Sequence, residues 1–166
     1  MPFLQRSLSV LTAFVVACGA GGQSASPTSA SSNPVVTIPG IRAVLDAPPS
    51  VRVGDSLTLR LILHNDSNAA IALPVMTARG FGFDPVVRNS SGTVVWQRLA
   101  GQYLLQDGEM RTMQPQATTE YQATWNLRGL DGALVPAGTY RVTGRLVTGS
   151  DSAVVTTPEM TLIVAP

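Results

Sequence analysis

The stretch LTLRLILH, residues 57–64, places a leucine at every second position. Because successive side chains of a β-strand point to opposite faces of a sheet, the leucines all fall on one face. A helix would spread the same leucines around its axis. Each leucine that becomes fully buried contributes roughly 1.5–3 kcal/mol to folding. The stretch therefore predicts a half-buried β-strand whose leucines line a core.

The same alternation recurs in YQATWNLRGLDGALVPAGTYRV, residues 121–142. Tyr121, Ala123 and Trp125 share one face, and the alternation resumes at Tyr140 after a loop that holds three glycines and a proline. The pattern predicts two half-buried strands with inward aromatic side chains, and we interpret the loop as their connection.

Further strands are expected wherever apolar alternation is bounded by Gly, Pro, Asn, Asp or Ser. They cover residues 41–47, 70–75, 83–89, 93–98 and 153–164, the last with a break at Pro158. Seven or eight short strands at this spacing predict an all-β fold, namely an antiparallel immunoglobulin-like β-sandwich.

The composition limits the classes of partner. The formal net charge of the 166-residue chain is +1, all of its basic residues are arginine, and none of them forms a basic run. Nucleic-acid binding depends on clustered basic residues that neutralise phosphates, so no nucleic-acid partner is expected. The single cysteine excludes an intrachain disulfide.

The amino-terminal segment MPFLQRSLSVLTAFVVAC, residues 1–18, has the features of an export signal. Arg6 precedes an uncharged and mostly apolar run, which is shorter than the ~20 residues of a membrane-spanning helix. The run ends in Val15-Val16-Ala17-Cys18, which resembles the bacterial lipobox. That resemblance implies a lipoprotein signal peptide over residues 1–17, cleavage before Cys18 and lipidation of its thiol. The alternative is an unmodified Cys18 in an ordinary secretory signal.

Residues 18–40 carry no charge and are mostly small or polar up to the pair Val35-Val36. Such a segment buries too little apolar surface to offset the entropy lost on ordering, so we expect a flexible, disordered tether. The folded domain is expected over residues 41–166. Lipidation at Cys18 would make the protein an exported, membrane-anchored lipoprotein of the bacterial cell envelope, in the periplasm or on the cell surface.

Few residues carry reactive chemistry. His64 is the only histidine, and with Cys18 lipidated no ligand set for zinc remains. A Ser-His-Asp set would rest on His64 at a strand end, and the chain has no Gly-x-Ser-x-Gly motif. The sequence therefore predicts no catalytic, metal-binding or cofactor-binding residue, and it predicts a protein that is not an enzyme. A hydrolase that uses His64 is the alternative.

The segment Asn65-Asp66-Ser67-Asn68 is interpreted as a turn, although it also offers oxygen ligands for calcium and fits the glycosylation pattern Asn-x-Ser. Trp96 and Trp125 fall at inward positions of their strands. We interpret both as core residues, and the alternative is an exposed aromatic anchor for a partner.

Three stretches together resemble the BsuPI family of intracellular proteinase inhibitors. They are residues 83–96 (FDPVVRNSSGTVVW), residues 113–126 (MQPQATTEYQATWN) and residues 131–140 (DGALVPAGTY). The family usually has Pro-Gly in the second stretch, whereas this chain has Pro115-Gln116. The resemblance implies a β-sandwich whose founding members inhibit serine proteinases, with Tyr140 closing a corner of the fold.

Two functions follow as expectations. The first is a non-catalytic, lipid-anchored envelope domain that binds a proteinase in the manner of an inhibitor, with the segment Leu99–Gln114 as a candidate for the loop presented to it. The alternative for this segment is an ordinary connection between two strands. The residues that contact the proteinase are not defined by the sequence. The second is a structural, assembly or adhesion module that docks onto another envelope protein.

Overall fold

The structure of the chain, a computed structural model, describes residues 37–76, 82–102, 108–148 and 150–166. These residues form twelve strands and no helix, which confirms the predicted all-β class. In chain order the strands are β1 (Ile41–Asp46), β2 (Ser50–Arg52), β3 (Leu57–Asn65), β4 (Ile71–Met76), β5 (Val86–Arg88), β6 (Val94–Gln97), β7 (Gly108–Met113), β8 (Thr118–Trp125), β9 (Gly138–Thr143), β10 (Arg145–Thr148), β11 (Ser150–Thr156) and β12 (Met160–Ala165).

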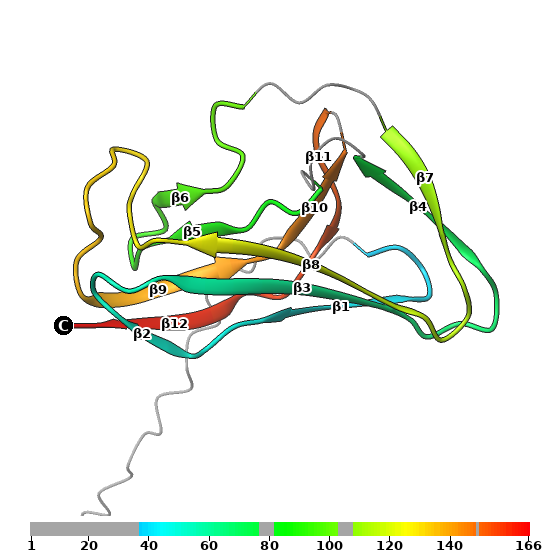
Figure 1. Cartoon of the computed structure of the whole chain (residues 1–166), viewed down its shortest axis with the longest axis horizontal. Helices are drawn as coiled ribbons and strands as arrows, with labels where there is room; N and C mark the ends of the chain where they lie inside the picture. The colour runs from blue at the N-terminus through cyan, green and yellow to red at the C-terminus, as the bar shows by residue number, and fades with distance from the viewer. Residues whose placement is uncertain (1–36, 77–81, 103–107, 149) are drawn as a thin grey trace, which may run out of the picture. The chain divides into compact units, whose positions relative to one another are not determined.

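Two sheets make the body of the domain. One has the strand order β1-β3-β8 and the other the order β2-β12-β9-β5-β6. All of their pairings are antiparallel except that of β2 with β12. Side chains from both sheets meet in one buried cluster, as in a β-sandwich. The long strands of the two sheets run in roughly the same direction (Figure 1).

The leucine stripe of β3 lies in that cluster as predicted. Leu57 is 2% exposed, and the three leucines that follow it at alternate positions are completely buried. Thr58 and Arg60, on the opposite face, are exposed. At roughly 1.5–3 kcal/mol for each buried leucine, this single stripe contributes about 6–12 kcal/mol of burial free energy before the entropy of ordering is subtracted.

Two two-stranded ribbons, β4–β7 and β10–β11, continue the main ladders beyond an interruption (Figure 1). The ribbon β4–β7 extends the β3–β8 pair, and β10–β11 extends the β9–β12 pair. A buried polar side chain bonds to backbone groups at each interruption, Asn65 at the first and Thr157 at the second. These bonds replace the ladder hydrogen bonds that the interruption removes.

The side chain of Asn65 is fully buried, and its amide and carbonyl groups are hydrogen-bonded to other groups of the protein. Its side-chain amide donates to the carbonyl oxygens of Ala69, Met113 and Gln114 at 2.8, 3.1 and 3.1 Å. Its Oδ1 accepts the backbone N–H of Ser67 at 3.0 Å. Such a side chain is available neither for a glycan nor for calcium, so the turn interpretation of this segment is confirmed.

The turn between β7 and β8 has Gln116 where the family usually has glycine. The N–H of Ala117 donates to the carbonyl oxygen of Gln114 at 3.1 Å, and Gln116 has a φ of 62°. Pro115 at the second position and a positive φ at the third are the features of a type II turn, which favours glycine at the third position. The left-handed conformation costs a non-glycine residue about 1–2 kcal/mol.

Asp84, in the first of the three resembling stretches, is a buried acid with a structural role. It is 2% exposed and lies just before β5. Its carboxylate accepts the side-chain amide of Gln97 at 2.7 Å, the backbone N–H of Leu99 at 3.0 Å and the guanidinium of Arg145 at 3.3 Å. The three bonds satisfy a buried charge and join the β6 end to β10.

Most predicted strands are present, and the break at Pro158 separates β11 from β12 as expected. Two strands, β2 and β7, were not predicted. The strand β2 has only three residues and exists through its parallel pairing with β12. The strand β7 carries little alternation, and its pairing with β4 decides its conformation. Neither pairing can be read from a local pattern.

The strain at Gln116 predicts that Gln116→Gly stabilises the protein. We expect the free energy of unfolding to rise by about 1 kcal/mol, because glycine adopts a positive φ without a Cβ clash. Urea denaturation of the full chain measures the change. The matched control Gln122→Gly, at an exposed position inside β8, should lower stability by about 0.5–1 kcal/mol. Equal effects of the two substitutions would contradict the turn assignment.

Candidate functional site

The candidate site is built on Trp125, the last residue of β8. Its indole is completely buried and contacts two other aromatic rings, both from the facing sheet. The ring of Trp96 stacks on it at a centroid distance of 5.7 Å, and Tyr140 meets it edge-on at 6.2 Å. The interpretation of Trp125 as a core residue is confirmed, and Trp96 is half-buried against the same cluster.

The buried indole directs the chain that leaves β8. Its N–H donates to the carbonyl oxygen of Arg128 at 2.8 Å. Between them Leu127 has a φ of 56° and a completely buried side chain. The left-handed residue turns the backbone back toward the indole, and burial of its side chain offsets the cost of that conformation. The loop therefore leaves the sheet in one defined direction.

The loop continues as a small hairpin, defined here as residues 128–134 and called the tip hairpin. Arg128 and Leu134 form an antiparallel bridge. The N–H of Gly129 donates to the carbonyl oxygen of Ala133 at 2.8 Å, and the N–H of Gly132 donates to that of Gly129 at 3.0 Å. Gly132 has a φ of 78°. This is the three-residue hairpin loop in which a left-handed glycine forms a bulge.

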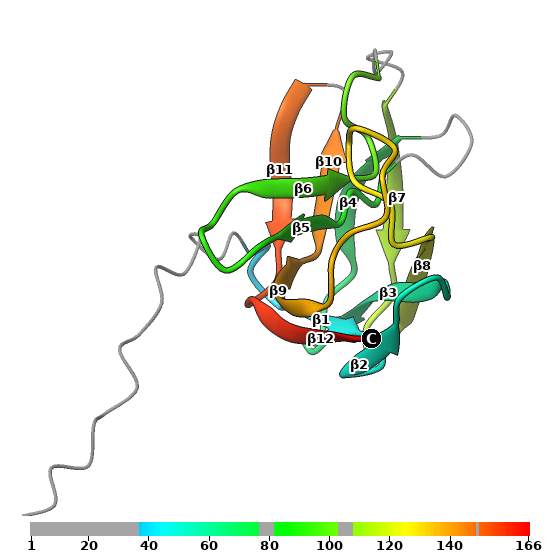
Figure 2. The same ribbon diagram turned by 90° about the vertical axis from the view of Figure 1, so that its left-hand side faces the viewer.

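Side chains and a neighbouring strand hold the tip hairpin further. The carboxylate of Asp131 accepts the N–H of Ala133 at 3.0 Å, and the guanidinium of Arg128 donates to the carbonyl oxygen of Gly132 at 2.8 Å. The N–H of Leu130 donates to the carbonyl oxygen of Val95 in β6 at 2.8 Å. Figure 2 shows this loop beside the β5–β6 hairpin. The tip hairpin thus covers part of the outer edge of the five-stranded sheet.

Tyr140 closes the other end of the loop. Its hydroxyl donates to the carbonyl oxygen of Pro136 at 2.7 Å, four residues upstream. This bond has the form of the tyrosine corner of immunoglobulin-like sandwiches, as the resemblance implied. Burial raises the pKa of the Tyr140 hydroxyl above its usual range. The bond requires the protonated phenol, because only that form donates a hydrogen.

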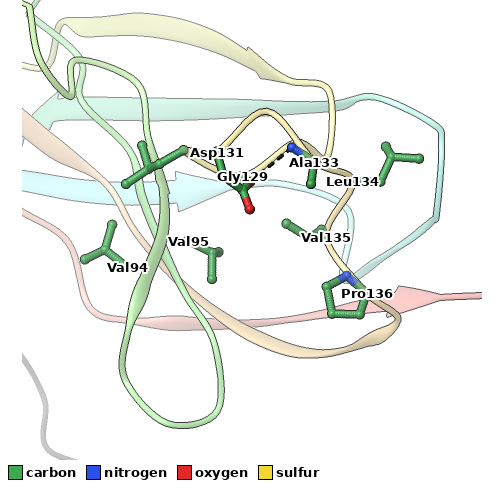
Figure 3. Close-up of a pocket in the computed structure, with 9 residues that line it drawn as sticks. Val94, Val95, Gly129, Asp131, Ala133, Leu134, Val135 and Pro136 are labelled. Carbon is green, nitrogen blue, oxygen red and sulfur yellow. Dashed lines mark hydrogen bonds between the residues drawn. The ribbon is translucent and has the colours of Figure 1, made fainter.

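The ordered loop nevertheless exposes apolar side chains. Leu130 is 57% exposed and Leu134 is 46% exposed. Between the loop and β6 lies a pocket of about 290 Å³ (Figure 3). Val94 and Val95 line it from β6, and the rest of the lining comes from Gly129, Leu130, Asp131, Ala133, Leu134, Val135 and Pro136. The lining is apolar except for Asp131, so the site can bind a partner surface but offers no reacting group.

The two ends of the segment Leu99–Gln114, predicted as the presented loop, are held by the core and by a strand. Leu99 is 5% exposed and its N–H is bonded to Asp84. Residues 108–113 are strand β7, paired with β4 along their whole length. Residues 103–107 lie outside the described residues. The described ends of this segment agree with the alternative of an ordinary connection between strands. The presented loop itself stays a prediction, because its middle is not described.

His64 lies near the end of β3 and contacts an acid. Its Nδ1 is hydrogen-bonded to Asp66, which also accepts a hydrogen bond from Arg42 at 3.0 Å. The hydrogen bond from Arg42, helped by His64, lowers the pKa of the Asp66 carboxyl. The hydroxyl of Ser67 is bonded to Asn65 at 2.7 Å. The residues of this cluster therefore bond to one another at the surface and do not form a nucleophile–base pair.

A second pocket, beside β1 and β3, is lined by charged side chains that pair with each other or with a neighbour. Its volume is about 480 Å³, and its Arg60 is 4.0 Å from Asp46 and 3.9 Å from Glu120. The charges of these exposed ion pairs neutralise one another, and the pocket indicates no particular ligand.

Within the described residues no three His, Cys, Asp or Glu side chains are grouped as a metal site would require. The predicted signal peptide and Cys18 lie outside the described residues. In the part of the chain that the structure describes, no helix has the length and apolarity to span a membrane.

The fold and the site define a β-sandwich domain with a hydrogen-bonded hairpin at the edge of its larger sheet, and this hairpin exposes apolar side chains. Residues 48–150 match the model of the BsuPI family, described as an intracellular proteinase inhibitor. The match covers more than half of the chain, so the chain belongs to this family, as the sequence resemblance indicated. No curated protein matches the chain.

Several solved structures align with most of the chain at low identity. The alkylpurine DNA glycosylase AlkC of Pseudomonas fluorescens aligns over 76% of this chain and 31% of its own, with 11% identity and a TM-score of 0.45. A β-glucosidase from Listeria innocua aligns over 76% and 16%, with 12% identity and a TM-score of 0.42. The CARDB domain of a Pyrococcus furiosus protein aligns over 76% and 94%, with 11% identity and a TM-score of 0.40. The chain thus spans less than a third of either enzyme, and no functional conclusion follows.

The raised tyrosine pKa predicts a loss of stability in alkali. Burial raises the pKa of Tyr140 and also that of Tyr121, above the ordinary value of 10.0. The stability that the two protonated tyrosines contribute to the folded state is therefore fully present below about pH 10. It is lost as the pH rises through their pKa values in the folded state. Tyr140→Phe should lower the free energy of unfolding at neutral pH by about 1 kcal/mol, because it removes the bond to Pro136.

Urea denaturation midpoints at a series of pH values from neutral to alkaline measure both effects. Above pH 10 the wild-type protein should lose more stability per pH unit than the Tyr140→Phe variant. If the two proteins show the same alkaline slope, Tyr140 does not contribute through its protonated form.

Proposed function

We propose that this chain is a non-catalytic proteinase-inhibitor domain tethered to the bacterial cell envelope through Cys18. The observation that carries the proposal is the match of residues 48–150 to a proteinase-inhibitor family. The fold supports an inhibitor because the tip hairpin is already ordered by its own hydrogen bonds. A loop that is ordered before binding loses little conformational entropy in the complex, which favours affinity.

The absence of a catalytic role rests on the chemistry of the described residues. His64 is bonded to Asp66 at the surface, and the hydroxyl of Ser67 is bonded to Asn65. The carboxylate of Asp84 is buried and satisfied by protein donors. The pocket beside the tip hairpin is lined by apolar side chains and one aspartate that bonds the backbone. These arrangements support binding rather than group transfer.

The envelope location is proposed from the amino-terminal sequence. The lipobox-like Val15-Val16-Ala17-Cys18 would put a lipidated cysteine directly before residues 19–37, and the domain begins at Ile38, which packs against the core. A flexible chain of that length has an end-to-end distance of roughly 25 Å. The domain would then stand clear of the lipid headgroups and could reach proteinases that act outside the cytoplasm.

Inhibition tests the first part of the proposal. The full-length mature protein, purified from the membrane fraction, should inhibit a subtilisin-type serine proteinase at micromolar concentration and remain intact. Hydrolysis of a chromogenic peptide measures the activity, and gel electrophoresis follows the integrity of the chain. No inhibition at this concentration, or simple digestion of the chain, would exclude the inhibitor function and leave the assembly or adhesion module.

Lipidation tests the second part. Intact mass spectrometry of the mature protein should give the mass of residues 18–166 plus acyl groups on Cys18. The variant Cys18→Ser should lose this modification and move from the detergent phase to the aqueous phase on phase separation. A mature protein that keeps residues 1–17, or an unmodified Cys18, would contradict the anchor and leave the inhibitor function untouched.

A further inference from the structure

We propose that the tip hairpin is the surface that contacts the proteinase, and that Leu130 enters an apolar specificity pocket of the proteinase active site. This inference rests on the proposed inhibitor function and deepens it. It names the contacting segment, which the sequence left undefined, and the class of enzyme, namely serine proteinases that prefer large apolar residues.

Exposure distinguishes Leu130 from its neighbours in the chain. Leu127 is completely buried and Val135 is 5% exposed, so the ends of the loop are anchored in the core. Leu130, at the first position of the three-residue loop, is 57% exposed, and Leu134 is 46% exposed. The tip therefore presents two large apolar side chains on a base that is itself buried. Side chains of this kind bind by entering a pocket on the partner.

The other exposed large apolar residues lack such a setting. Among the described residues they are Val44, Val53, Met110 and Ile163. Val44, Met110 and Ile163 lie within strands β1, β7 and β12, and Val53 directly follows β2. The side chains within these strands stand on the face of a sheet and not at the end of a projecting loop, and Val53, in the turn after β2, is only 36% exposed. The tip hairpin, in contrast, is a connection between strands that ends in a turn.

The hydrogen bonds of the tip hairpin leave it little freedom to rearrange. The backbone bonds between Gly129, Gly132 and Ala133 close the loop, and Asp131 and Arg128 bond to its backbone with their side chains. The bond from Leu130 to Val95 fixes the tip to β6. A proteinase would meet Leu130 in the conformation that it has in the free protein, so binding needs no ordering of the loop.

The conformation of the tip hairpin also determines whether a bound proteinase can cleave the peptide bond after Leu130. Extended peptides are recognised by proteins as an added strand, through backbone hydrogen bonds. Leu130 and Asp131 lie instead in a closed turn ended by the left-handed Gly132. The backbone therefore cannot align as an extended strand without breaking the bonds between Gly129, Gly132 and Ala133. The side chain of Leu130 fills the pocket while the bond after it stays uncleaved.

The experiment compares variants of the full-length mature protein against subtilisin. Leu130→Asp should weaken inhibition roughly 30-fold or more, because a carboxylate cannot enter an apolar pocket. Leu130→Ala, which preserves the hairpin with less change of chemistry, should weaken it about 10-fold. The matched control is Ile163→Asp on β12, which lies three strands away from β6 in the same sheet and is 52% exposed. It should change the inhibition constant by no more than about 3-fold.

A change of specificity makes the test independent of stability. Leu130→Arg should weaken inhibition of subtilisin and increase inhibition of trypsin about 10-fold or more, because the trypsin pocket carries an aspartate. Thermal unfolding of every variant, followed by circular dichroism, shows whether the fold is intact. Intact mass after incubation should show no cleavage between Leu130 and Asp131.

The outcomes separate this inference from the function on which it rests. If the wild-type protein inhibits and folded Leu130 variants inhibit equally well, the contact surface lies elsewhere and the inhibitor function stands. Rapid cleavage after Leu130 would overturn the closed-turn contact. If the wild-type protein inhibits no proteinase, the proposed function itself fails. An equal loss in Ile163→Asp would show that the effect at Leu130 is not specific to the tip.

Discussion

The buried N–H of Trp125 is the constraint on which the loop side of the domain depends. An indole that is completely buried needs a hydrogen-bond acceptor within the protein, and here the acceptor is the carbonyl oxygen of Arg128. The carbonyl reaches the indole because Leu127 takes a left-handed conformation and buries its side chain. One aromatic residue at the end of β8 therefore determines where the next hairpin begins and in which direction it projects.

The tip hairpin has two roles, because its backbone bonds to the sheet while its side chains remain exposed. The bond between Leu130 and Val95 covers part of the edge of β6, a strand that would otherwise present unpaired backbone groups to other chains. The same bond leaves the Leu130 side chain exposed. A segment whose backbone is needed by the sheet can be rigid without a disulfide, and rigidity is the property that an inhibitory contact requires.

At the other end of the sandwich, the β3–β8 and β9–β12 pairings are interrupted and each is followed by a two-stranded ribbon. Asn65 and Thr157 bond to backbone groups where the long strands stop, and the ribbons β4–β7 and β10–β11 continue beyond them. At one interruption Gln116 occupies a left-handed position that glycine would fill more easily. Gly144 stands at the other, where an added Cβ would lie 3.3 Å from side-chain atoms of Leu45 and Thr157. The two positions carry different constraints, one of conformation and one of space.

The amino-acid sequence by itself determined the all-β class, the leucine stripe of β3, the inward Trp125 and the family, because side-chain alternation and turn residues are local signals. The tertiary structure alone decided that β2 and β7 are strands, since their pairing partners β12 and β4 are distant in the chain. It also decided the candidate site. Val95 and Leu130 are joined only in the folded protein, and a loop's exposure depends on what packs beneath it. The sequence pattern of residues 121–142 predicted only a connection between two strands. It could not predict the ordered hairpin, because hydrogen bonds between distant backbone groups leave no trace in a local pattern.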